Sequence, residues 1–422
     1  MRKKIGIIVQ RYGMQINGGA ESHARMIAER LSDQFDITIF TSCAIDYHTW
    51  RSELSEGESF EDDIRILRFK SDRMMTKKED EYLSRKIRER HLSQKFYRWL
   101  RRPDWWYKIF PQAEVTDKDH IRWLETQGPF TPDLIAYLKK YEEEYTAFIF
   151  FTAVYYPTAA GVLAVPHKSI LIPLMHDEPA AYFHVFKIVM SNAKWILFNS
   201  LSEQRFCEKI FPIQEAKKKV VAVGIDIPDT SIDKNILSTF NVHKPYIIYI
   251  GRIDSYKGCD TLLKYFSKFS SQSKASLQLV LVGKNMMNIV SSPSIVLTGF
   301  VAEKEKEQLL KQAEALVIPS AYESLSLALL ESFACKVPVI ANGKTEVLKD
   351  HIQDSGGGWC YQNECDFISI LSTVSDNSKL NKEKGMNGYE YVKSNYRWNG
   401  VLESYLEAIK DIESNTATTF ND

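Results

Sequence analysis

The stretch YIIYIGRIDSYKGC, residues 246–259, decides the fold of the second half of the chain. Its first five residues form a continuous apolar run, which is typical of a parallel strand buried on both faces. The next residues, up to Gly258, form a loop, and a helix is expected to start near Cys259. In a doubly wound sheet ligands bind at the carboxyl ends of the strands. The loop is therefore predicted to border a binding crevice.

The same order of strand, loop and helix recurs on both sides of this stretch, and no short repeat period is visible. Strands are expected at 5–9, 37–40, 147–151, 169–173, 195–199, 220–223, 246–250, 277–282, 295–297, 315–318 and 337–341. This alternation predicts an α/β fold with two doubly wound domains. We expect an N-terminal domain at 1–222 with an irregular insertion at about 70–130, a C-terminal domain at 223–396, and a helical tail at 397–422 that packs back toward the first domain.

Composition excludes several classes of protein. The 422 residues include 54 Lys and Arg against 54 Asp and Glu, so the formal charge is zero, which argues against a general nucleic-acid binder. The 6 cysteines are scattered without a CxxC pair, which indicates neither a disulfide framework nor a zinc site. The apolar run at 5–9 is too short for a signal peptide. The expected compartment is the cytoplasm.

Two segments raise the question of membrane contact. Residues 145–166 carry no charge and are long enough to span a bilayer, but Pro157 and Gly161 favour a strand, a turn and a helix started by proline. Residues 85–108 combine nine basic residues and two acids with interleaved Trp, Tyr and Phe. This composition suits peripheral contact with anionic lipid headgroups, and it equally suits a solvated helix whose aromatic side chains pack onto the domain.

Two cations in the loop after strand 246–250 point to an anionic ligand. Arg252 can form forked hydrogen bonds and Lys257 acts as a point charge, so the pair would suit a diphosphate. Gly251 and Gly258 allow the backbone to come close to a bulky anion. Taken alone, the same segment also fits a loop with two solvated charges.

A second motif, SAYESLSLALLE at residues 320–331, follows the apolar strand 315–318. Ser324 or Ser326 is expected to cap a helix whose free first-turn amides form an anion site. Glu323 precedes the helix and Glu331 lies two turns into it, about 12 Å further along. Carboxylates so far apart cannot hydrolyse one bond together, but they could hold hydroxyls at the two ends of an extended ligand. Taken alone, they also fit one acid favoured by the helix dipole and one surface acid.

Together these motifs resemble the retaining GT-B glycosyltransferases of family 4. The matching segments occur in the family's order: Gly18-Gly19-Ala20-Glu21, His176-Asp177, Val223-Gly224-Ile225-Asp226, Gly251-Arg252 with Lys257-Gly258, and Glu323 with Glu331 as the Glu-x7-Glu motif. The resemblance covers nearly the whole chain outside the insertion. It implies a GT-B fold, in which two Rossmann-like domains face each other across a cleft, with the acceptor on the N-terminal side and a nucleotide sugar on the C-terminal side.

The resemblance also implies roles for single residues. Arg252 and Lys257 would bind the donor diphosphate and stabilise the leaving nucleoside diphosphate. Glu331 would accept hydrogen bonds from the ribose and Glu323 from the transferred sugar. His176, which as a lone histidine would more often be structural, would face the reacting sugar as part of the catalytic set. Further donor contacts are expected from Gly18, Gly19 and Gly251, from backbone amides of Leu325, Ser326 and Leu327, and on the base side from Phe300 and Val301.

Charge supplies the physical account of catalysis. Breaking the sugar–phosphate bond moves negative charge onto the diphosphate, and two cations with a helix N-terminus stabilise that charge in the transition state. These groups do the work of a divalent metal, so no metal and no cofactor are expected. No carboxylate is placed as a covalent nucleophile. The resemblance implies attack from the face of the departing phosphate, with a phosphate oxygen taking the acceptor's proton.

Other functions of an α/β chain are weighed against this one. A nicotinamide-dependent oxidoreductase needs GxGxxG directly after the first strand, but eight residues separate Val9 from Gly18. A sugar-nucleotide epimerase of the same architecture and a non-catalytic GT-B-like binding protein remain as alternatives. Residues 342–346 read NGKTE where the family often has a Gly-Gly turn before a glutamate. The expected acceptor is a glycan or a lipid-linked molecule of surface polysaccharide or glycolipid synthesis. The reaction is expected in the cytoplasm or at the inner face of the membrane. Loop 10–17 and the insertion are expected to bind the acceptor.

Overall fold

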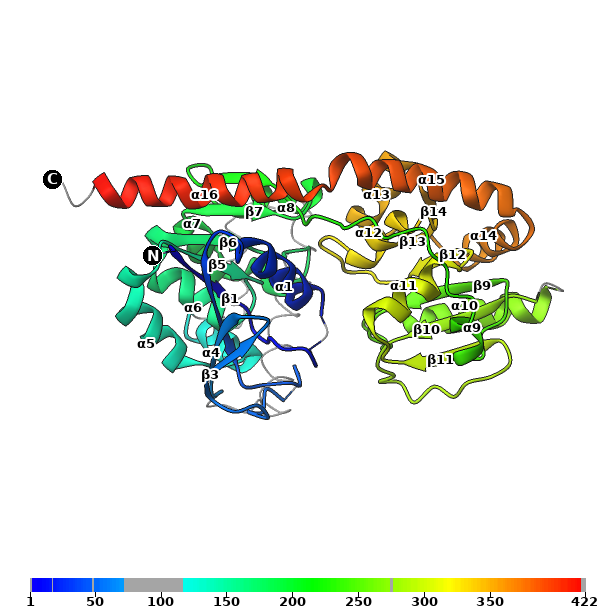
Figure 1. The fold of residues 1–422 in the computed structure, drawn as a ribbon, viewed down its shortest axis with the longest axis horizontal. Coiled ribbons are helices and arrows are strands. Elements are labelled where there is room, and N and C mark those ends of the chain that lie inside the picture. The colour runs from blue at the N-terminus through cyan, green and yellow to red at the C-terminus, as the bar shows by residue number, and fades with distance from the viewer. Residues whose placement is uncertain (1, 17, 48, 72–116, 274–275, 419–422) are drawn as a thin grey trace, which may run out of the picture. The chain divides into compact units, whose positions relative to one another are not determined.

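A computed structural model describes residues 2–16, 18–47, 49–71, 117–273 and 276–418 of the chain (Figure 1). The chain forms two compact units, which we call the first and second domains. The first domain comprises Met1–Ala222 and Leu402–Asp422, and the second comprises Val223–Val401. The basic and aromatic stretch 85–108 lies outside the described residues, and its contact with a membrane stays a prediction.

The first domain is built on an 8-stranded sheet in the order β3-β4-β2-β1-β5-β6-β7-β8. All neighbouring strands run parallel except β3, which pairs antiparallel with β4. The central strands β1 and β5 are apolar and buried, as expected for strands covered on both faces. The strands are β1 (Lys4–Ile8), β2 (Asp36–Ser42), β3 (Gly57–Glu61), β4 (Ile64–Phe69), β5 (Ala147–Phe151), β6 (Ser169–Ile172), β7 (Trp195–Phe198) and β8 (Lys217–Val220).

Helices follow the strands of the first domain as βαβ units require. The uncharged stretch 145–166 forms β5 and the proline-started α6, which confirms its interpretation as a strand, a turn and a helix. Among the described residues, no helix is long and apolar enough to cross a membrane. The helices are α1 (Gly19–Leu31), α4 (Asp117–Gln127), α5 (Pro132–Tyr141), α6 (Tyr156–Ala164), α7 (His184–Asn192) and α8 (Leu201–Ile210), with short 3-10 turns at Glu142–Glu144, Pro166–Lys168 and Pro179–Tyr182.

Three expectations for the first domain need correction. The hairpin of β3 and β4 was not predicted, because β3 is mostly exposed and lacks an apolar pattern. The last strand is β8 rather than the expected apolar strand 220–223. It is an edge strand that carries three lysines and pairs with β7. The end of the insertion is not irregular: α4 places Trp123 against Phe183 and Phe186 in the hydrophobic core.

The second domain contains a 6-stranded sheet in the order β11-β10-β9-β12-β13-β14, in which all neighbours are parallel. The direction of winding reverses between β9 and β12, so their carboxyl ends form the topological switch point where ligands of such sheets bind. The strands are β9 (Tyr246–Ile250), β10 (Gln278–Val282), β11 (Ile295–Gly299), β12 (Ala315–Ile318), β13 (Val339–Asn342) and β14 (Gly358–Tyr361). The edge strand β14 was not predicted, since only four residues of mixed character form it.

Helices of the second domain alternate with its strands, and α10 begins at Cys259 as the sequence predicts. The helices are α9 (Ile236–Thr239), α10 (Cys259–Gln272), α11 (Glu303–Lys311), α12 (Leu327–Ala334), α13 (Glu346–Ser355), α14 (Glu364–Asp376) and α15 (Ser378–Asn395).

The last helix, α16 (Trp398–Thr418), confirms that the tail is helical. It buries an apolar stripe of Val401, Tyr405, Ala408, Ile409 and Ile412. From Leu402 onward it belongs to the first domain, where Asp411 accepts a hydrogen bond of 2.9 Å from the Trp195 indole. In Figure 1 it is the red helix that ends near the C label.

Candidate functional site

The loop after β9 carries the two predicted phosphate-binding cations. Asp254 organises it: one carboxylate oxygen accepts a hydrogen bond from Arg252 Nε, and the other accepts the Lys257 backbone N–H at 2.7 Å. Sequence reasoning did not single out Asp254, although an Asp three residues before Lys257 is typical of such turns. Gly258 ends the loop at φ 78°, and an added Cβ would lie 2.6 Å from the Pro319 carbonyl oxygen. Only glycine lets this loop approach the one after β12 so closely.

The structure brings two of the predicted catalytic residues together. Lys257 Nζ lies 2.8 Å from Glu323 Oε1, although 66 positions separate them in sequence. Their side chains are 30% and 15% exposed, so the pair is largely buried yet open on one side. Beside it, the rings of Tyr256 and Tyr322 stack with centroids 5.7 Å apart. The cation predicted to bind phosphate and the carboxylate predicted to bind sugar hydroxyls therefore meet at the switch point between β9 and β12.

The start of α12 differs from the predicted cap. Ser326 occupies the N-cap position, but its side chain accepts no hydrogen bond from the helix, because φ of 69° places the residue in the left-handed region. The amides of Ser326 and Leu327 donate to no acceptor within the described part of the chain. Helix-terminal amides without partners can bind an anion. Since α12 starts at Leu327, Glu331 lies in its second turn rather than two full turns in.

Glu331 is paired within the second domain with a residue that the sequence analysis missed. Lys306 Nζ of α11 lies 3.1 Å from Glu331 Oε1 and 3.0 Å from Oε2, and it also pairs with Glu303. Burial raises the pKa of Glu331, and the Lys306 charge opposes that shift. The ion pair leaves lone pairs of the carboxylate available to ribose hydroxyls. No sequence pattern singles out Lys306, since α11 carries many charges.

The predicted base-side residues differ in exposure. Phe300, directly after β11, is 64% exposed, whereas Val301 is 6% exposed. Phe300 can stack on a flat base, while only the backbone of Val301 can reach a ligand. Gly251, after β9, has φ 145°, and its N–H donates to the Val282 carbonyl at 2.9 Å.

In the first domain, Gly18 and Gly19 precede and begin α1. A Cβ added to Gly18 would lie 2.0 Å from Glu21 Oε2, whereas one added to Gly19 would meet nothing within 4 Å. Glu21 forms a buried ion pair with Arg11, whose Nη2 lies 2.6 Å from Glu21 Oε1. Arg11 was not predicted as a site residue, and its role is to brace the loop that leads to the glycines.

His176 follows β6, and its Nε2 lies 3.6 Å from Glu178 Oε2. The loop before it is held by Glu203 of α8, which is 2% exposed. The two carboxylate oxygens of Glu203 accept backbone N–H groups of Met175 and Asn199, each at 2.7 Å. The pattern Ser200-x-x-Glu203 signals a helix start. It does not reveal that Glu203 joins the loops after β6 and β7.

Replacing Glu203 with Gln is expected to destabilise the first domain by about 1–3 kcal/mol. The amide oxygen of Gln can accept one of the two backbone N–H groups, but its nitrogen cannot accept the other, which leaves a buried donor unpaired. Urea unfolding would measure the change, with Glu208→Gln on the exposed side of α8 as the control. Equal stabilities of the two variants would contradict the assigned role.

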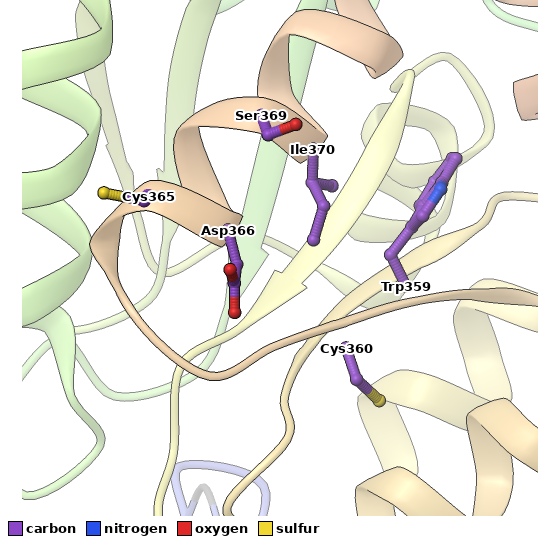
Figure 2. A pocket seen from close by; sticks show the side chains of 6 residues that line it. All are labelled: Trp359, Cys360, Cys365, Asp366, Ser369 and Ile370. Atoms are coloured by element: carbon purple, nitrogen blue, oxygen red, sulfur yellow. The ribbon is translucent and has the colours of Figure 1, made fainter.

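A pocket in the second domain lies away from these residues. Figure 2 shows Trp359 and Cys360 of β14 on one side and residues of α14 on the other, including Cys365, Asp366 and Ile370. No predicted site residue lines it. Within the described ranges, no group of three or more His, Cys, Asp or Glu side chains gathers that could hold a metal ion.

The second domain also carries a family signature. Residues 234–391, which include every predicted donor residue of that domain, match the family model for glycosyl transferases group 1. This match lies within the second domain. Among related sequences, this chain is 25% identical over 259 residues to an uncharacterized 41.2 kDa protein in the cps region of Klebsiella pneumoniae, covering 59% of this chain and 70% of that one.

Two further relatives carry names that describe activity. An uncharacterized glycosyltransferase of Methanocaldococcus jannaschii is 24% identical over 56% of this chain and 64% of its own length. An N-acetylgalactosaminyltransferase of Campylobacter jejuni, named for a diphospho-undecaprenol acceptor, is 22% identical over 47% of this chain and 55% of its own length. The alignments thus span about half to seven tenths of the relatives.

Solved structures show the fold of this chain. Sucrose-phosphate synthase from Thermosynechococcus elongatus matches with a TM-score of 0.68 and 15% identity, covering 98% of this chain and 100% of that one. Anabaena HepE in complex with UDP and glucose matches with a TM-score of 0.62 and 13% identity, covering 99% of each chain. The fold of two parallel-sheet α/β domains is GT-B, as the sequence predicts.

Proposed function

We propose that this glycosyltransferase moves a sugar from a nucleotide-sugar donor to a glycan or lipid-linked acceptor, with retention and without a metal. The observation that carries the proposal is the 2.8 Å contact between Lys257 Nζ and Glu323 Oε1 beside the open amides of Ser326 and Leu327. The names of the relatives support the acceptor class, since one acts on a diphospho-undecaprenol substrate and another is encoded in a cps region.

The charges of this site suit departure of a diphosphate. As the sugar–phosphate bond breaks, Lys257 and Arg252 would face growing negative charge, and the amides at the start of α12 would add donors that need no reorganisation. Glu323 would accept hydrogen bonds from hydroxyls of the transferred sugar. In this proposal, the acceptor attacks on the face of the leaving phosphate, and a phosphate oxygen takes its proton. Binding of acceptor is assigned to the first domain.

A thermal-shift panel of UDP, GDP, ADP and dTDP tests the donor site. A ligand present at 100 times its Kd stabilises a protein by about 2.7 kcal/mol, so one base should raise Tm clearly above the others. Release of that diphosphate from its sugar conjugate should then depend on an added acceptor. Interconversion of sugars without such an acceptor would favour the epimerase, and binding without any turnover would favour a non-catalytic protein.

Transfer is expected to persist in EDTA, because the side chains and amides above supply the positive charge that a metal would otherwise bring. The measurement compares initial rates before and after dialysis against EDTA. Complete loss of activity that Mg²⁺ restores would contradict metal independence.

A further inference from the structure

The loop that carries Glu323 is held from its inner side by three side chains of the β13–α13 segment. Asn342 Nδ2 donates to the Pro319 carbonyl at 3.0 Å, and Thr345 Oγ1 donates to the Ser320 carbonyl at 2.8 Å. His351 Nε2 lies 3.2 Å from the Leu325 carbonyl. We call Asn342, Thr345 and His351 the β13–α13 donors. The first two belong to the stretch 342–346 in which this sequence departs from the family pattern.

The partners of His351 define its tautomer. Because the Leu325 oxygen can only accept, the proton of the neutral ring lies on Nε2. Nδ1 then accepts a hydrogen bond from Tyr391, whose hydroxyl lies 3.1 Å away, and the Tyr396 hydroxyl lies 3.5 Å away. Burial lowers the pKa of His351 to about 4, so the ring is neutral at physiological pH. His351 is therefore a fixed donor aimed at the loop.

The geometry of the peptide bond between Leu325 and Ser326 fixes the direction in which the Ser326 N–H points. In a trans peptide the C=O and the next N–H point to opposite sides. The Leu325 carbonyl points inward to the buried His351, so the Ser326 N–H points away from it. Ser326 also has a left-handed φ of 69°, a conformation that is strained for a non-glycine residue and persists only when its surroundings enforce it.

We propose that the β13–α13 donors are positioning residues for the donor site: they hold the Glu323 loop by its carbonyls so that the Glu323 carboxylate and the Ser326 amide face the departing diphosphate and sugar. The inference rests on the proposed function and deepens it. It also assigns a role to residues 342–346, in which this sequence differs from the family pattern. These residues act through the Glu323 loop rather than on the substrate. Packing alone would not require three hydrogen-bond donors directed at three carbonyls of one loop.

The test measures how strongly the protein prefers a diphosphate over a monophosphate. The probe is whichever of UDP, GDP, ADP or dTDP binds the wild-type protein, together with the monophosphate of the same nucleoside, both by calorimetry. The proposal places the held loop against the phosphate that a monophosphate lacks. His351→Leu should therefore lower the ratio of monophosphate to diphosphate Kd by about fivefold or more. His351→Gln, whose amide nitrogen can donate to Leu325, should restore the preference.

Two more variants keep the test decisive. Thr345→Val removes a donor without changing shape, and it should lower the same ratio even if His351→Leu does not fold. Lys349→Ala, on the exposed side of α13, should leave it unchanged. An unchanged ratio in folded Thr345→Val and His351→Leu overturns the positioning role alone. Absence of any diphosphate binding by the wild-type protein overturns the proposed donor site as well.

Discussion

Replacing Lys257 with Ala should lower sugar transfer by about two to three orders of magnitude, the loss typical when one preorganised group that stabilises developing charge is removed. The ammonium group lies 2.8 Å from Glu323 Oε1, and Lys257 belongs to the loop that Asp254 organises. Without it, the leaving diphosphate loses a cation and Glu323 loses its partner. Initial rates of nucleoside diphosphate release at saturating donor would measure the effect.

The fold should survive this replacement, because Lys257 lies at the end of a loop with part of its side chain exposed. Lys264→Ala is a matched control, since Lys264 lies on α10 of the same domain with a largely exposed side chain. Its rate should equal that of the wild type. Wild-type turnover by Lys257→Ala, with an unchanged circular dichroism spectrum, would remove Lys257 from the mechanism.

Replacing Glu331 with Gln should weaken recognition of the ribose. A hydrogen bond to a charged group contributes about 1.5–3 kcal/mol, so the wild-type protein should bind a ribonucleoside diphosphate at least about tenfold more tightly than its deoxyribose analogue. The variant should lose most of that preference. Competition of the two diphosphates in a binding assay would give the ratio of dissociation constants directly.

The control for this ratio is Glu303→Gln, because Glu303 contacts the same Lys306 but has an exposed side chain. It should disturb the charge of Lys306 while leaving the preference for ribose intact. If Glu331→Gln discriminates between the two sugars as well as the wild type does, Glu331 serves only as the partner of Lys306.

Local patterns predicted most of the fold correctly. The apolar runs that form β1, β5, β9, β10 and β12 are buried on both faces. Each run can be recognised from its own four or five residues. The elements that escaped prediction lie at sheet edges. Exposed β3 and the lysine strand β8 pair through backbone groups that any residue possesses, so their side chains carry little signal.

The sequence by itself determined the α/β class, the order of the motifs and the types of residue at the strand ends, because each depends on neighbours along the chain. Only the tertiary structure decided which of those residues meet. Lys257 with Glu323, Glu331 with Lys306, and His351 with Leu325 are joined by sheet order and helix packing. Contacts between residues so distant in sequence follow from the folded topology, and no local spacing records them.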